Sequence, residues 1–89
     1  MRAVIDGRKE WTRASLHAEL ARSLNFPSWY GCNLDALFDC LTDLHEETEL
    51  VLTDTEAMVQ SLGSYVERFC YVLNAAAEEN PRLHIIIEP

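Results

Sequence analysis

Three short apolar segments, at residues 2–6, 49–53 and 83–87, divide the chain into two intervals of similar design. The segments are rich in valine, isoleucine and leucine, and two of these three residue types favour β-strands. Each interval carries two stretches whose apolar residues recur at helical spacing. Strands this far apart pair in parallel, because a parallel pair needs a long crossover. The sequence therefore predicts an α/β fold of order β-α-α-β-α-α-β, a three-stranded parallel sheet packed with about four helices.

The first predicted helix begins at about Ser15 and carries Leu16, Leu20 and Leu24 on one face. We expect Asn25 to end this helix, because asparagine tolerates the left-handed conformation common at helix C-termini.

The second predicted helix follows Asn33, a good N-terminal cap because its side chain can accept a hydrogen bond from a free backbone amide. Four leucines then recur at helical spacing and should face inward: Leu34, Leu37, Leu41 and Leu44.

The second interval contains two pairs of residues with the spacing of a capping box. Thr53 with Glu56, and Ser64 with Glu67, should therefore begin a short third helix and a longer fourth helix. The last segment, residues 83–87, is apolar at nearly every position. This pattern is expected of a strand that is covered on both faces.

The size and charge of the chain limit what it can be. Its 89 residues predict a single domain, residues 1–89. A formal net charge of −8 disfavours binding to nucleic acid or to an anionic membrane and attracts cationic partners. The chain has no apolar run of the length of a membrane span and no signal-peptide pattern at its start. Three unpaired cysteines favour reduced thiols and a cytoplasmic location.

Candidate catalytic and metal-binding residues give only weak signals. Cys32 precedes a helix, where a thiolate could be stabilised, but no histidine is tied to it by a known signature. Asp35 and Asp39 lie on successive turns of one helix, which offers no cleft for an acid–base pair. The cluster at residues 45–47, His-Glu-Glu, reads as a solvated turn rather than a metal site. We therefore predict no enzyme, no metal and no cofactor.

The stretch at residues 27–33, Pro-Ser-Trp-Tyr-Gly-Cys-Asn, leads directly into a helix that carries Asp35 and Asp39. Residues four apart share one helix face, so the two carboxylates are neighbours. Aromatic side chains beside carboxylates are typical of a surface that binds arginine and lysine. Tyr30 and Phe38 could equally be packed in the core, since both have large apolar areas.

Residues 30–42, Tyr-Gly-x-Asn-Leu-Asp-Ala-Leu-x-Asp-Cys-Leu-Thr, resemble the signature of the barstar family, intracellular inhibitors of the secreted ribonuclease barnase. The opening strand at residues 3–5 and the pair Leu16-His17 match the same family. The resemblance implies a barstar-like fold and a protein inhibitor of a microbial, barnase-type ribonuclease. It would confer toxin immunity by binding a basic secreted ribonuclease or related nuclease toxin one-to-one, and would be monomeric when free.

The resemblance also implies which residues contact the partner. Asp39 would occupy the place of the substrate phosphate, Asp35 would meet the basic rim of the enzyme, and Trp29 would stack on an active-site histidine. The full implied set is Trp29, Tyr30, Gly31, Asn33, Leu34, Asp35, Ala36, Phe38, Asp39 and Thr42.

The chain departs from the family at the edge of this site. Phe38 stands in place of a tryptophan, and the family's acidic contact on the last helix falls at Ala75 or Ala76. Glu78 or Glu79 could replace that contact. The alternative is an immunity or regulatory module of the same fold directed at a different basic protein or toxin.

Overall fold

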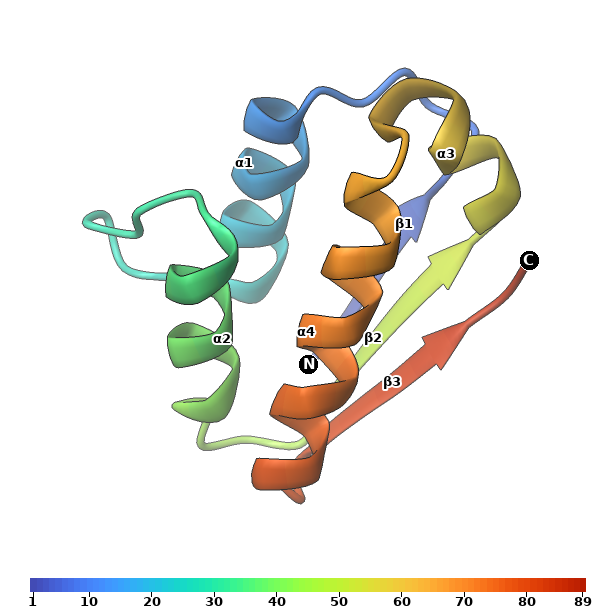
Figure 1. Cartoon of the computed structure of the whole chain (residues 1–89). Coiled ribbons are helices and arrows are strands. Elements are labelled where there is room, and N and C mark those ends of the chain that lie inside the picture. The colour runs from blue at the N-terminus through green and yellow to red at the C-terminus, as the bar shows by residue number, and fades with distance from the viewer.

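The computed structural model describes residues 1–89 and has the α/β arrangement that the sequence predicts (Figure 1). In chain order the elements are β1 (Arg2–Asp6), α1 (Arg13–Leu24), α2 (Leu34–Thr42), β2 (Thr48–Thr53), α3 (Thr55–Leu62), α4 (Tyr65–Glu79) and β3 (Leu83–Ile87). All strand pairs are parallel and the strand order is β1-β2-β3, so β2 is the central strand. The predicted fold class is confirmed.

The hydrophobic core lies between the sheet and the helices, which cover one face of it (Figure 1). Ile5, Leu50 and Leu52 point from the sheet into this core and are fully buried. Leu20 of α1 and Phe69 of α4 are buried against them to the same degree. None of the helices is long and apolar enough to cross a membrane.

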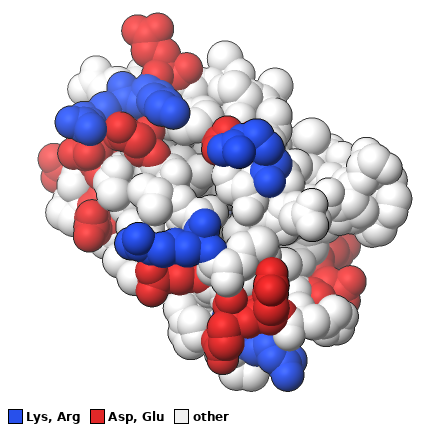
Figure 2. Space-filling model, turned by 180° about the vertical axis from the view of Figure 1, so that it is seen from behind, with Lys and Arg blue, Asp and Glu red and all other residues white.

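The opposite face of the sheet is open, which corrects the expectation that the last strand is covered on both faces. Val4, Val51 and Ile86 are neighbours across the three strands on this face. Val51 on the central strand is 4% exposed, but Val4 and Ile86 on the edge strands are 49% and 39% exposed. The expectation was wrong because all the helices lie on one side. Figure 2 shows this side of the molecule, with charged groups of both signs around uncharged surface.

The structure shows that α1 begins slightly earlier than predicted. Thr12 caps it, and the side chains and backbone amides of Thr12 and Ser15 exchange hydrogen bonds. Asn25 ends the helix in the left-handed conformation, with φ of 57°, as expected.

The two predicted capping boxes of the second interval do not form. Thr53 is still part of β2, so α3 instead follows Asp54, whose side chain makes no capping hydrogen bond. Ser64 precedes α4 in a helical conformation and also makes no capping bond, because the chain enters α4 by a tight turn closed by the Val66 amide and the Gly63 carbonyl. Local spacing was misleading here because the cap residues Asp54 and Ser64 have left-handed and helical conformations, not the extended conformation that a capping residue adopts.

Candidate protein-binding surface

The N-terminus of α2 is held by Asn33, as the sequence predicts. Its Oδ1 accepts a hydrogen bond from the Ala36 amide at 2.8 Å, and its Nδ2 donates to the Gly31 carbonyl at 3.2 Å. One side chain therefore joins the first turn of the helix to the loop before it. Cys32 lies between Gly31 and Asn33 and has φ of 52°. This is a left-handed backbone conformation that residues other than glycine and asparagine rarely adopt.

The other end of α2 is held by α4. Asn80, which is 5% exposed, donates hydrogen bonds from Nδ2 to the carbonyls of Leu41 and Leu44, at 2.9 and 3.1 Å. Leu37 and Leu41 are fully buried beneath the helix. These contacts hold the buried face of α2 against the core. The acidic side chains on its exposed face therefore point in a defined direction.

The loop before α2 is anchored by a buried polar chain of three side chains. Nδ1 of His17 lies 2.6 Å from the hydroxyl of Tyr30, and Nε2 of His17 lies 2.7 Å from the hydroxyl of Tyr65. Burial of His17 lowers its pKa, which favours the neutral ring that donates through one nitrogen and accepts through the other. Phe26 packs beside Tyr30, with ring centroids 4.9 Å apart. The loop is therefore tied to α1 and α4 as well as to α2.

The exposed face of α2 is acidic and uncompensated. Asp35 and Asp39 are exposed and lie one helical turn apart, and Asp43 follows one turn later at the end of the helix. None of the three forms an ion pair with a basic side chain of this protein. This face is available for a cationic group that comes from outside the molecule.

The other residues that the sequence assigns to this surface differ in exposure. Trp29 is 78% exposed, and its indole is the most exposed large apolar group of the chain. Gly31 and Asn33 are exposed, whereas four residues are half-buried: Leu34, Ala36, Phe38 and Thr42.

Tyr30 is only 9% exposed and packs in the core. Little of its side chain is accessible to a partner. The structure thus favours a positioning role for Tyr30 over a direct contact.

A small groove of about 520 Å³ separates α2 from α4. Asp35, Phe38 and Asp39 line one side, and Tyr71 and Ala75 line the other. Ala76, the alternative position for the family's acidic contact, is fully buried, so Ala75 is the residue that faces the groove. Tyr71 was missed by the sequence analysis, although its position one helical turn before Ala75 could have indicated it.

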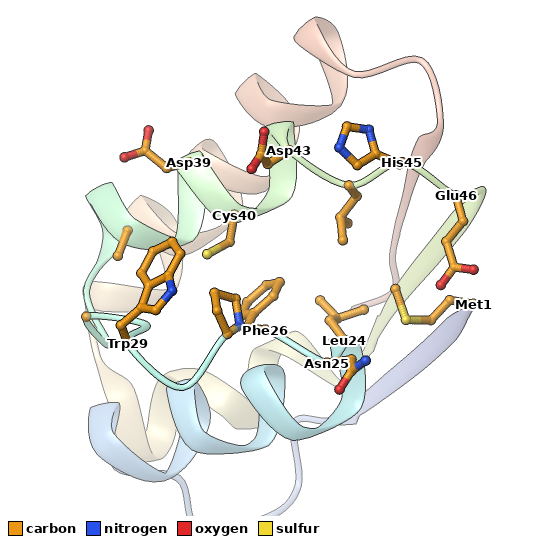
Figure 3. Close-up of a pocket in the computed structure, with 14 residues that line it drawn as sticks. Met1, Leu24, Asn25, Phe26, Trp29, Asp39, Cys40, Asp43, His45 and Glu46 are labelled. Atoms are coloured by element: carbon orange, nitrogen blue, oxygen red, sulfur yellow. The ribbon is translucent and has the colours of Figure 1, made fainter.

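A larger groove of about 740 Å³ lies on the other side of α2 (Figure 3). Phe26 and Trp29 of the loop lie on one side of it, and Cys40 faces them from α2. Its rim carries exposed Asp39, Asp43, His45 and Glu46. The sequence analysis missed this groove, because it is assembled from segments that are distant along the chain and no local pattern marks it.

The thiol in the large groove is not activated, and the structure holds no cluster of metal ligands. Burial raises the pKa of the Cys40 thiol, and the negative charges of Asp39 and Asp43 raise it further. A thiol in this environment stays protonated and is a poor nucleophile. No three His, Cys, Asp or Glu side chains lie close enough to hold a metal ion. The arrangement is suited to binding by charge and shape.

Comparison with known proteins shows which family the fold belongs to. The protein-family model described as "Barstar (barnase inhibitor)" matches residues 1–87. A curated relative from Bacillus subtilis (strain 168), named "Putative ribonuclease inhibitor YrdF", is 42% identical over 87 residues, which cover 96% of each chain. The match includes the loop, α2 and the residues of α4 that line the small groove.

Proposed function

Because this chain belongs to the barstar family, we propose that it is a protein inhibitor of a microbial, barnase-type ribonuclease. In this proposal α2 and the loop before it enter the active site of the ribonuclease and block it. The protein acts by occupying the site and carries out no reaction itself. It would protect the cell that produces it from its own or a neighbour's secreted ribonuclease.

The observation that carries this proposal is the exposed, unpaired pair of carboxylates on α2. A ribonuclease active site uses cations to hold the phosphate groups of RNA, and a carboxylate can replace a phosphate in hydrogen bonds with arginine. Asp39 is exposed and has no basic partner within its own chain. We assign to Asp39 the place of the substrate phosphate and to Asp35 a contact with the basic rim.

The loop gives the acidic face an apolar border. Trp29 stands 78% exposed beside Asp39 at the large groove, so it could stack on a flat side chain of the ribonuclease. Gly31 and Ala36 are small, and they allow the partner's backbone to approach closely. The cap contacts of Asn33 and the buried hydrogen bond of Tyr30 hold this border in one conformation, which lowers the entropic cost of binding.

The experiment that tests the proposal is titration calorimetry of the protein with barnase, combined with an assay of RNA hydrolysis. We expect one-to-one binding and loss of ribonuclease activity. Asp39→Ala should weaken binding by about 3–5 kcal/mol, because it leaves the partner's desolvated cations unpaired. Glu56→Ala removes an exposed carboxylate of α3, far from the proposed surface, and is the matched control. Equal binding by Asp39→Ala and by the unchanged protein would exclude this mechanism.

One observation favours a second candidate, a module of the same fold that binds a different basic protein or toxin. Ala75 lines the small groove where the resemblance implies an acidic contact, and Tyr71 adds an aromatic ring that is 74% exposed. The α4 side of the surface is thus more apolar than the family pattern implies. A protein captured from the producing organism that is not a ribonuclease, together with no binding to barnase, would support this second candidate.

A further inference from the structure

We propose that the large groove beside α2 receives one large apolar side chain of the inhibited ribonuclease, and that a basic residue next to it pairs with the acidic rim. This inference rests on the function proposed above and adds a second contact region to it. The groove would help to determine which ribonucleases the protein binds.

The composition of the groove indicates an apolar group with a positive neighbour. Its interior is apolar, formed by Leu24, Phe26 and Leu44 together with the thiol of Cys40 (Figure 3). The carboxylates of Asp43 and Glu46 stand on its rim, and neither forms an ion pair within the chain. An apolar side chain fits the interior, and a cation beside it compensates the charge at the edge.

The position of the groove indicates that the occupant belongs to the protein partner. Trp29, Gly31, Ala36 and Asp39 line the groove and are also part of the proposed binding surface. A protein interface of ordinary size buries about 800 Å² on each partner. A ribonuclease centred on Asp39 would therefore extend over the groove, and an empty apolar groove beneath it would lose contact energy.

The two sides of the groove are held in place before any partner binds. The Phe26 ring packs on Tyr30, which is bonded to the buried His17. On the opposite side, the carbonyl of Leu44 accepts a hydrogen bond from the buried Asn80. A groove with fixed walls selects side chains by size and shape at low entropic cost.

The test is titration calorimetry of Leu44→Ser against barnase. Leu44 is half-buried and lines the groove. We expect the substitution to weaken binding about tenfold or more, as for loss of a good apolar contact in a pocket. Leu62→Ser changes a half-buried leucine at the end of α3, far from the groove, and is the matched control. It should lower stability to a similar degree without weakening binding.

A second measurement does not depend on how Leu44→Ser folds. In the complex of the unchanged protein with barnase, nuclear Overhauser contacts from the Leu44 methyl groups should reach an apolar side chain of barnase. Asp43→Asn, an exposed substitution, should also weaken binding about twofold to fivefold, as loss of an exposed ion pair does.

The outcomes separate this inference from the proposed function. If Asp39→Ala weakens binding while Leu44→Ser and Asp43→Asn do not, the inhibitor mechanism stands and the groove contact is wrong. If the Leu44 methyl groups show nuclear Overhauser contacts to solvent but none to barnase, the groove contact is also wrong. If the unchanged protein does not bind barnase, both proposals fail for this class of ribonuclease.

Discussion

The hydroxyl oxygen of Tyr30 lies 2.6 Å from Nδ1 of the fully buried His17, and this contact joins the proposed binding loop to the core. The other ring nitrogen of His17 contacts the hydroxyl of Tyr65 on α4. The loop, α1 and α4 thus meet at one imidazole ring. The shape of the binding surface should therefore depend on a residue that no partner can touch.

Tyr30→Phe should destabilise the protein by about 1–3 kcal/mol, because it leaves a buried nitrogen of His17 without its hydrogen bond. Urea denaturation gives the free energy of unfolding. Tyr71→Phe is the matched control, since Tyr71 is 74% exposed and makes no side-chain hydrogen bond in the structure. Equal stability of the two variants would show that the contact is unimportant.

The stability of the protein should fall as the pH decreases below about 6.5. Burial lowers the pKa of His17 in the folded protein, so the unfolded chain, where a histidine has a pKa of about 6.5, binds the proton more readily. The contribution of His17 to the free energy of unfolding is therefore fully present above that pH and is lost progressively below it. The carboxylates of Asp6 and Glu19, whose pKa values are lowered by Arg8 and Arg22, add their own loss only below about pH 4.

Denaturation measured between about pH 5 and about pH 7 isolates the contribution of His17. His17→Gln should be less stable at neutral pH and should lose much of the pH dependence in this window. His84→Gln, at the exposed edge of the sheet, is the matched control and should keep it, because that change leaves the buried His17 in place. An unchanged pH dependence in His17→Gln would contradict the assignment.

Asn33 shows which parts of the site can be predicted from sequence. Its capping role depends on an amide three residues away, so the local pattern was sufficient. The strand segments and the inward positions of Leu37 and Leu41 were predictable for the same reason, but Leu44, expected on the same helix face, lies beyond the end of α2 and is only half-buried. The open face of the sheet was not, because the apolar run at residues 83–87 does not tell which side the helices take.

The grooves were equally inaccessible to sequence reasoning. Phe26, Cys40 and Glu46 come together only through the packing of α2 against the loop and against α4. The failed capping boxes at Thr53 and Ser64 have a related cause, since β2 continues through Thr53 and the turn before α4 holds Ser64 in a helical conformation. The type and order of the elements were predicted from local patterns, but the grooves, the open face of the sheet and the caps of α3 and α4 depend on tertiary packing.

Asn33→Ala should lower stability by about 1 kcal/mol, the usual effect of removing a helix N-cap. It should weaken binding as well, because the same side chain also holds the Gly31 carbonyl of the loop. Thr12→Ala is the matched control, since Thr12 caps α1 away from the proposed surface. The two variants should have similar unfolding free energies but different affinities for barnase. Similar affinities would indicate that Asn33 acts on stability alone.

Association with a basic ribonuclease should be steered by charge, since the protein carries a net charge of −8 and an unpaired acidic face. Raising the ionic strength from about 0.01 M to about 1 M shortens the Debye length from about 30 Å to about 3 Å. We expect the association rate to fall about tenfold or more, and the dissociation rate to change less. Stopped-flow tryptophan fluorescence, to which exposed Trp29 contributes, gives both rates. A salt-independent association rate would argue against an interface centred on the acids of α2.

Glu79, rather than Glu78, should replace the acidic contact that Ala75 has lost. Val72 and Ala75 line the small groove, and Glu79 lies seven and four residues after them, on the same helix face. Glu78 instead lies seven residues after Tyr71, which lines the same groove but is 74% exposed, so we expect Glu78 to point more towards solvent. Glu79→Gln should weaken binding to barnase by about 0.2–1 kcal/mol, typical of an exposed ion pair, and Glu78→Gln should have a smaller effect. Calorimetry on both variants decides the assignment, and a larger loss for Glu78→Gln would reverse it. Because the two changes remove the same charge from adjacent residues, long-range electrostatics cancels in the comparison and only the direction of the side chain remains.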